Sequence, residues 1–238
     1  MDSWLTRKIS EAIMYLVLEK KEMMKLDLKR ELKTYFQPSA KTPTIIQIPL
    51  FQFAMIDGAI EPGKEPDNSP AFQKAVEGLY GISYTLKFMF KQRLENPIDY
   101  SVMALEGLWW VDEGAFDILR KDNLKWTLMI LQPSIITPDI FCEGLEKLRK
   151  KRGDQPVFTQ LRLEDFDEGL CVQLMHIGPY ATEPVSLERM HAFARQQGYQ
   201  PRLGDDGKHH EIYLGDPRKT IPEKMKTVLR HPLQVASR

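Results

Sequence analysis

The sequence is poor in cysteine, has no excess of either charge and contains no long apolar run. Two cysteines, Cys142 and Cys171, cannot build a disulfide framework, and we expect both to be buried thiols in a reducing cytoplasm. Lysine plus arginine and aspartate plus glutamate number 33 each, so no basic field attracts nucleic acid or an anionic membrane. The apolar run at 12–18 is too short to span a bilayer. We therefore expect a cytoplasmic protein with neither a nucleic-acid nor a membrane partner.

What the sequence does contain is enough apolar material for a core. Of 238 residues, 42% are hydrophobic, which suits one large domain or two small ones. Residues 1–36 are predicted to form a helical extension, because residues 3–36 carry an apolar stripe at helical spacing. The stripe would pack on the body of the protein or on another chain. A protein partner or a homodimer through this helix therefore stays open.

From residue 44 onward, strand patterns alternate with helix patterns within a predicted domain at 37–238. The first half, at about 44–133, is predicted to contain strands at 45–57, 100–111 and 124–131 and a helix at 71–92. After a linking helix at 138–151, the second half, at about 157–234, is predicted to contain strands at 169–177, 208–214 and 227–233 and a helix at 187–197. Ser69-Pro70 and Thr137-Pro138 are typical helix starts, and Asp57-Gly58 is a turn signal.

The two halves resemble each other weakly in sequence and closely in order. Residues 55–58 match 175–178, residues 105–109 match 210–214, and residues 125–129 match 226–230. Each half thus reads strand, helix, strand, strand. We predict an α+β fold in which the duplicated halves form an antiparallel sheet, with helices on one face and a ligand cleft on the other.

Alternation along the two middle strands selects the candidate cleft residues. Glu106 and Trp110 share one side of the first strand, and His209, Glu211 and Tyr213 share one side of the second. If the apolar sets lie under the helices, Glu106 and Glu211 both face the cleft, beside Trp110 and Tyr213. A glutamate is almost never buried without a partner, so this arrangement indicates a binding or catalytic site.

Four motifs resemble the GyrI-like small-molecule-binding family. They are EGLYGISYTLKF at 77–88, LEGLWW at 105–110, MHIGPY at 175–180 and HHEIYLGDPR at 209–218, and the resemblance extends over about 25–233. It implies a duplicated fold and a glutamate on a groove strand that meets lipophilic cations in drug-sensing relatives. Glu211 occupies the matching position. The chain has no helix-turn-helix, and its subgroup resembles stand-alone proteins that hydrolyse cyclopropane-bearing DNA alkylators with an aromatic cage and a carboxylate.

Each candidate carboxylate has two interpretations. Glu211 is either a surface carboxylate paired with Lys208 or Arg218, or a pocket group that attracts a cation or activates water. Glu106 has the same two interpretations. Glu183 is either the N-terminal carboxylate of the next helix or a second catalytic group.

The aromatic and histidine candidates are divided in the same way. Trp110 is the preferred cage wall, Trp126 suits either core or cage, and Tyr84 is the preferred hydroxyl donor. His176 and Tyr180 bracket the Gly178-Pro179 turn and either cap a strand end or reach the ligand.

A metal site is expected to be absent. His209 and Glu211 can converge, but a metal normally needs three protein ligands. No phosphate-binding or cofactor motif is recognised, so no cofactor is expected.

Three functions remain at this stage. The first is binding of amphipathic aromatic molecules with hydrolysis of strained electrophiles, in which Glu211 or Glu183 activates water and Tyr213 assists. The second is a non-catalytic sensor or sequestering protein that acts through a protein partner. The third is inhibition of a larger enzyme such as a topoisomerase, which the zero net charge disfavours.

Overall fold

The computed structural model describes residues 23–112, 124–204 and 207–236. Its strands are β1 (Met24–Leu26), β2 (Thr44–Ile48), β3 (Phe51–Ala59), β4 (Ile98–Tyr100), β5 (Leu105–Trp110), β6 (Lys125–Leu131), β7 (Arg162–Phe166), β8 (Gly169–Ile177), β9 (Tyr199–Pro201), β10 (His209–Tyr213) and β11 (Lys226–Val235). The α-helices are α2 (Leu28–Glu31), α3 (Lys33–Phe36), α4 (Pro70–Lys91), α5 (Pro138–Arg152) and α6 (Glu183–Gln196). Short 3₁₀ helices are η1 (Pro66–Asn68), η2 (Pro156–Thr159), η3 (Tyr180–Thr182) and η4 (Pro222–Lys224).

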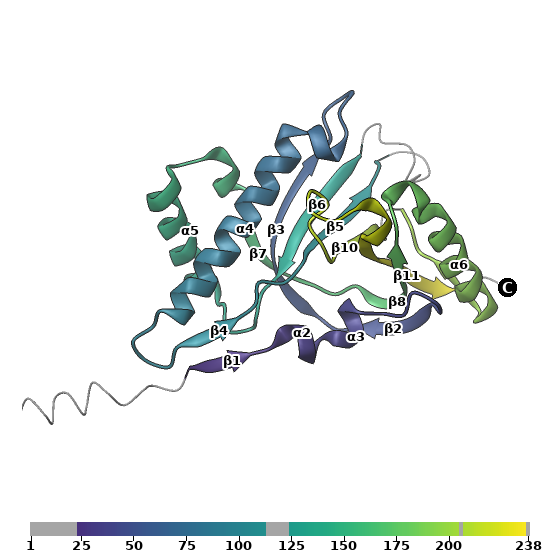
Figure 1. The fold of residues 1–238 in the computed structure, drawn as a ribbon, viewed down its shortest axis with the longest axis horizontal. Coiled ribbons are helices and arrows are strands. Elements are labelled where there is room, and N and C mark those ends of the chain that lie inside the picture. The colour runs from purple at the N-terminus through teal and green to yellow at the C-terminus, as the bar shows by residue number, and fades with distance from the viewer. Residues whose placement is uncertain (1–22, 113–123, 205–206, 237–238) are drawn as a thin grey trace, which may run out of the picture.

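One nine-stranded antiparallel sheet organises the described chain (Figure 1). Its order is β2-β8-β11-β10-β5-β6-β3-β7, with β9 paired to β11. The repeats are β3-α4-β5-β6 and β8-α6-β10-β11, and their middle strands β5 and β10 pair at the junction. The predicted α+β fold with duplicated strand–helix–strand–strand halves is therefore confirmed. Among the described residues, no helix combines the length and the apolar character needed to cross a membrane.

The outer strands are exchanged between the halves, a feature that the sequence pattern did not predict. β2, which precedes the first repeat, pairs with β8 of the second. β7, which precedes the second repeat, pairs with β3 of the first. Each repeat thus pairs with the strand that precedes the other repeat in the chain, so the linking segments contribute to a single continuous sheet.

The predicted helix starts are confirmed by their caps. The Ser69 hydroxyl accepts a hydrogen bond from the backbone nitrogen of Phe72 at 3.1 Å, and Pro70 is the first residue of α4. The Thr137 hydroxyl accepts from Ile140 at 3.3 Å at the start of α5. In both cases the side chain satisfies an amide that the helix itself leaves unpaired.

Two predictions are wrong, one for the N-terminal segment and one for Cys142. The predicted continuous helix is not observed in its described part, where β1 pairs with β4 and two short helices follow; the stripe at 4–16 lies outside the described residues. Leu28 and Phe36 are buried against the core, which explains why this segment follows the body of the protein. Cys171 is buried as expected, but Cys142 on α5 is exposed.

Asp57-Gly58 is not a turn, because both residues lie inside β3. Gly58 pairs with Trp126 of β6, and a Cβ atom on Gly58 would overlap the Trp126 ring. The glycine therefore gives the indole room to lie across the strand, which is a common reason for glycine within a sheet.

α4 and α6 lie on the same face of the sheet, on either side of the middle strands (Figure 1). Phe72 of α4 stacks on Trp109 of β5 with ring centroids 5.6 Å apart. His191 of α6 contacts His231 of β11. Trp109 pairs with His209 of β10, and His209 also contacts His231, so all these side chains share one face. β5 and β10 thus meet in the gap between the two helices.

The register at this junction separates Glu106 from Glu211. Glu106 pairs with Ile212, whereas Gly107 pairs with Glu211, and directly paired residues point to the same face. The prediction that Glu106 and Glu211 face one cleft is wrong. In β10 the apolar Ile212 lies on the face away from the helices, with His210 and Glu106, and Glu211 lies on the helix face. A shift of one residue between two strands moves every side chain to the other face.

On the face away from α4 and α6, four ionisable side chains form a buried network. His210 lies 3.1 Å from Glu106 and 3.0 Å from Glu168, which lies between β7 and β8. Arg230 donates to Glu168 at 3.1 Å and to the backbone oxygen of Tyr35 at 2.6 Å. Burial alone would raise the pKa of Glu168, but His210 and Arg230 outweigh it and lower that pKa to about 2. The network ties both repeats to the N-terminal segment.

Removing the arginine tests this network. We expect Arg230→Met to lower the free energy of unfolding by about 3–5 kcal/mol, because it leaves the Glu168 carboxylate buried without its cation. Urea denaturation at pH 7 measures the change. Arg218→Met is the matched control, since Arg218 is exposed and pairs with Asp216 at the surface; its cost should stay within about 0.5 kcal/mol. Equal costs for the two variants would contradict a structural role for the network.

The close approach at Gly58 is tested by a double-mutant cycle. Gly58→Ala should cost about 1–3 kcal/mol of unfolding free energy, because the new methyl group overlaps the Trp126 ring. In a Trp126→Leu background, most of that cost should disappear, since the contact no longer exists. A cost that is the same in both backgrounds would mean that Gly58 serves the strand for another reason.

Candidate functional site

Two buried carboxyl groups face each other on the helix side of the sheet. Glu211 belongs to β10, and Glu183 is the first residue of α6. Glu183 is 0% exposed and Glu211 is 7% exposed. We call these two residues the carboxyl pair. Two ionised carboxylates in one buried place repel each other strongly, so the pair favours a state in which one group keeps its proton.

Glu211 is the member of the carboxyl pair that is held ionised. Tyr213 donates its hydroxyl to Glu211 Oε2 at 2.5 Å, and His209 Nε2 lies 2.9 Å from Oε1. Trp109 Nε1 donates to the Tyr213 hydroxyl at 2.9 Å and orients it. Burial would raise the pKa of Glu211, but hydrogen bonds from His209, Tyr213 and Glu183 outweigh it, so the pKa is lowered. The carboxylate is therefore fixed in position and charge.

Glu183 is the protonated member. No hydrogen bond to either oxygen of Glu183 meets the usual geometry. The polar groups beside it are the Glu211 carboxylate and the Thr227 hydroxyl. A carboxyl group can bond to another carboxylate only by keeping its own proton. Burial raises the pKa of Glu183, and the negative charge of Glu211 raises it further. Two carboxyls whose pKa values are pushed apart are typical of an acid and a carboxylate with separate roles.

Gly107 makes room for the hydrogen bonds around Glu211. It lies directly opposite Glu211 in the sheet, and a Cβ atom there would lie 2.8 Å from Trp109 Nε1 and 3.1 Å from the Tyr213 hydroxyl. Any larger residue would push the indole or the phenol aside. The glycine in the LEGLWW motif is thus required by side-chain packing on the site face.

Tyr180 marks the side on which this site meets solvent. It lies in η3, just before Glu183, and its ring meets the Tyr213 ring edge-on at a centroid distance of 6.1 Å. Tyr180 is 39% exposed, and Tyr213 is partly exposed. Burial raises the pKa of the Tyr180 hydroxyl, with Glu211 and Glu183 adding to the effect. The two phenols provide an aromatic surface next to the carboxyl pair.

His176 holds the neighbouring turn. Its Nδ1 lies 2.9 Å from the Ser186 hydroxyl of α6, and its Nε2 lies 3.2 Å from the Pro179 oxygen. Gly178, with φ of 141°, reverses the chain between them. These contacts fit the structural interpretation of His176, which fastens the start of α6 over the sheet and so positions Glu183.

Besides Glu106, three predicted site residues lie away from the carboxyl pair, namely Trp110, Trp126 and Tyr84. Trp110 is on the opposite face of β5 from Trp109, and the Lys208 ammonium lies 3.5 Å above its ring, so the chain itself occupies this aromatic surface. Trp126 is 2% exposed and packs edge-on against Phe72 in the core. Trp109 belongs to the buried core, and its indole nitrogen contacts Tyr213 at the site.

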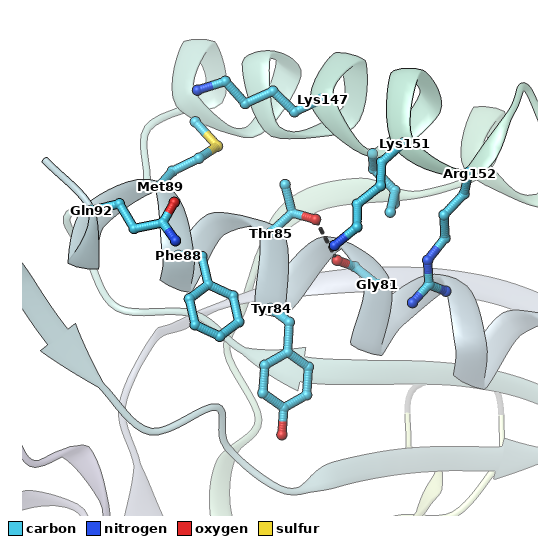
Figure 2. A pocket seen from close by; sticks show the side chains of 10 residues that line it. Gly81, Tyr84, Thr85, Phe88, Met89, Gln92, Lys147, Lys151 and Arg152 are labelled. Carbon is cyan, nitrogen blue, oxygen red and sulfur yellow. Dashed lines mark hydrogen bonds between the residues drawn. The ribbon is translucent and has the colours of Figure 1, made fainter.

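Tyr84 lies on the exposed side of α4, stacked between Tyr80 and Phe88. It lines a groove of about 680 Å³ between α4 and α5. Figure 2 shows Tyr84 and Phe88 projecting from α4 on the side away from α5, with Lys147 and Lys151 extending from α5. This groove contains no carboxylate and none of the residues around Glu211. It is therefore separate from the candidate site.

A metal ion must be considered at the carboxyl pair. Glu183, His209 and Glu211 each offer a ligand atom, and these atoms lie within 4.8 Å of one another. The expectation that only two residues converge there is thus incomplete, because Glu183 arrives from α6. Glu211 already uses both oxygens for hydrogen bonds, so a metal would have to displace them. We interpret the cluster as a hydrogen-bonded acid–carboxylate pair.

Sequence reasoning missed Trp109, Gly107 and two histidines, His231 and His191. Trp109 and Gly107 lie on the alternation set of β5 that had been assigned to the core. The correct register of β5 against β10 would have found both. His231 and His191 lie outside every motif, and no periodic signal connects them with His209.

Comparison with known proteins agrees with this architecture. The GyrI-like small molecule binding domain matches residues 150–234. An uncharacterized conserved protein from Listeria innocua is similar with a TM-score of 0.78 and 40% identity, covering 88% of this chain and 100% of that one. Two structures of a hydrolase from Listeria innocua have TM-scores of 0.74 and 0.76 at 38% and 39% identity, with the same coverage. No curated protein is significantly similar.

The matched region contains α6, β10 and β11, the elements that carry both carboxyls and the histidines around them. The duplicated fold, the similarity over the full length of the Listeria innocua proteins and the domain match agree with one another. The chain belongs to the GyrI-like small molecule binding domain family.

Proposed function

We propose that this protein hydrolyses a planar, strained electrophile, such as a cyclopropane-bearing alkylator, at the carboxyl pair. The observation that carries the proposal is the buried contact between a protonated Glu183 and an ionised Glu211. Small-molecule binding belongs to the family as a whole. The similar proteins from Listeria innocua that are described as hydrolases favour turnover over binding alone.

Glu183 is the general acid in this proposal. When the three-membered ring opens, the electron pair of the breaking C–C bond moves through the conjugated system to the carbonyl oxygen of the substrate. That oxygen takes the proton of Glu183 and becomes a phenol. A neutral carboxyl with a raised pKa keeps its proton at neutral pH and can deliver it at this moment.

Glu211 is the electrostatic partner. A water molecule forms the new C–O bond at the ring carbon, and positive charge develops on that carbon and on the water oxygen. The Glu211 carboxylate, oriented by His209 and Tyr213, stabilises this charge without having to reorient. The oxonium that results loses its proton to solvent water. The products are an alcohol and a phenol on one molecule.

The aromatic surface supports recognition of the substrate. Tyr180 and Tyr213 offer ring faces and edges on the solvent side of the carboxyl pair, and aromatic side chains favour planar apolar ligands. The ionised Glu211 adds an attraction for lipophilic cations. A planar compound with a carbonyl group at one end would thus lie on the tyrosines with its oxygen toward Glu183.

Turnover is tested with a planar cyclopropane-bearing alkylator and mass spectrometry of the ring-opened product. We expect Glu183→Gln and Glu211→Gln each to lower kcat by about 10²–10⁴-fold, because each removes one of the two charge states that the step requires. Both variants should still quench tryptophan fluorescence on binding, since Trp109 stays beside the site. The matched control is Glu223→Gln, an exposed carboxylate in η4, which should keep full turnover.

Three outcomes would count against this assignment. Full turnover in both site variants would exclude the carboxyl pair as the catalytic centre. Fluorescence quenching without product in the unaltered protein would leave a binding protein. Turnover that is abolished by a chelator and restored by a divalent metal would replace the acid–carboxylate mechanism by a metal mechanism at the same residues.

The charge state of Glu183 also predicts a dependence of stability on pH. The folded protein keeps a proton on Glu183 that the unfolded chain loses above its ordinary pKa of 4.5. Stability therefore falls as pH rises from 4.5 toward the raised pKa of the folded state. Glu183→Gln removes this proton uptake, so it should be more stable than the unaltered protein at pH 8 by about 1–3 kcal/mol.

Denaturation curves at pH 5, 6.5 and 8 measure this difference. It should shrink toward pH 5, where the unfolded carboxyl also begins to bind its proton. A stability difference that does not change with pH, or that grows as pH falls, would mean that Glu183 is ionised in the folded protein.

A further inference from the structure

The groove between α4 and α5 has an apolar side and a cationic side (Figure 2). The apolar side belongs to α4 and includes Thr85 and Met89. The cations that line it come from α5 and are Lys147, Lys151 and Arg152. Its volume of about 680 Å³ falls within the range of about 300–1,000 Å³ that is usual for small-molecule sites. Among the described residues, no acidic side chain lines this groove.

Two glycines bring the helices into contact below the groove. A Cβ atom on Gly144 of α5 would lie 2.7 Å from Leu86 Cδ2, and one on Gly81 of α4 would lie 3.3 Å from Leu148 Cδ1. Leu148 is only 1% exposed, and Gly81 is buried. The floor is therefore closed by apolar contact. Because α4 and α5 already touch there, they cannot close the groove by moving together.

The α4 side offers mainly apolar surface. Thr85 donates its hydroxyl to the backbone oxygen four residues earlier at 2.7 Å, so its methyl group is left for a ligand. Met89 has a flexible thioether side chain, which adapts to ligands of different shape. Tyr84 and Phe88 are 47% and 44% exposed and continue the apolar surface around α4. Gln92, at the end of the groove, adds one amide.

Positive charge gathers at the C-terminal end of α5. Lys147 is compensated by Glu143, 2.8 Å away, whereas neither Lys151 nor Arg152 has an ion-pair partner in the part of the chain that the structure describes. Basic residues in a last turn also stabilise the helix dipole. That effect applies equally to Lys150, which does not line the groove. The two interpretations therefore differ in what they predict for adjacent lysines.

We propose that the groove between α4 and α5 binds a small amphipathic anion, with its apolar body along α4 and its carboxylate or sulfonate at Lys151 and Arg152. Opposite charges attract most strongly where no acidic group competes, and the groove meets this condition. The ionised Glu211 favours the opposite ligand charge at the carboxyl pair, so the two sites separate ligands by charge. The inference does not rest on the proposed hydrolysis, because the groove shares no lining residue with the carboxyl pair.

Fluorescence titration with anilinonaphthalene sulfonate tests the groove, because this aromatic anion becomes fluorescent in apolar sites. We expect one molecule to bind per chain. Lys151→Gln should raise its Kd by about fivefold, since one of two uncompensated cations is lost. Lys150→Gln is the matched control: it removes the same charge from the next residue of α5, and it should change the Kd by less than about twofold. Lys151→Arg should keep the affinity.

An uncharged analogue separates charge recognition from apolar binding. Phenylnaphthylamine has the same rings without the sulfonate, so its affinity should be the same for the unaltered protein and for Lys151→Gln. Amide chemical shifts in NMR spectra locate the anionic probe. They should change at 81–92 and 147–152, and they should stay constant around Tyr180 and Tyr213.

Several results would overturn the proposal. The probe may fail to bind the unaltered protein, or Lys150→Gln and Lys151→Gln may weaken it equally; either result excludes recognition of an anion by the groove. Shift changes centred on Tyr180 and Tyr213 would place the anion at the carboxyl pair instead. Binding should persist in Glu183→Gln. Since none of these measurements involves turnover, the proposed hydrolysis can fail while the groove still binds the anion, and the reverse also holds.

Discussion

The pairing of β5 with β10 joins the two halves of the sheet and decides which side chains meet across it. Gly107 lies opposite Glu211, and this small residue leaves space for the Trp109 indole and the Tyr213 hydroxyl. Those two groups orient Glu211 toward α6, whose first residue is Glu183. Because side chains alternate along a strand, another register would exchange Glu211 for His210 on the site face. The candidate site thus depends on one strand pairing.

The same junction carries two polar networks, one on each face of the sheet. They differ in how the charges of their carboxylates are compensated. On the face away from the helices, Arg230 and His210 compensate Glu168 and Glu106, and all are hydrogen-bonded. On the helix face, two carboxyls meet, and His209, His231 and His191 are hydrogen-bonded one to the next behind Glu211. A compensated network stabilises a register, whereas an uncompensated carboxyl stores a proton at a cost in stability. The first network therefore maintains the strand pairing that the second one uses.

Much of the fold follows from local patterns. The helix starts at Ser69 and Thr137 were predicted because a hydroxyl residue followed by proline is typical of the first positions of a helix. The strand at 169–177 was predicted to the residue because its apolar run ends at Gly178, where a positive φ is needed. These features depend on neighbours within a few residues. The family resemblance identified the same repeats from their motifs.

The errors concern contacts between distant segments. Both faces of β10 are buried, so alternation along β10 did not distinguish the face of Glu211 from that of Ile212. The exchange of β2 and β7 between the halves depends on long connections that leave no periodic signal. Asp57-Gly58 was predicted to be a turn because the side chain that requires a glycine there is distant in sequence. That side chain, the ring of Trp126, lies 68 positions away on another strand.

The carboxyl pair and the hydrogen bond between His191 and His231 both tie α6 to the sheet. α6 contributes Glu183 at its first turn and His191 two turns later, so one helix carries both a member of the carboxyl pair and the partner of His231. The start of α6 is fixed by His176 through Ser186 and Pro179. A small movement of α6 would lengthen the bond from His191 to His231 and separate Glu183 from Glu211 at the same time.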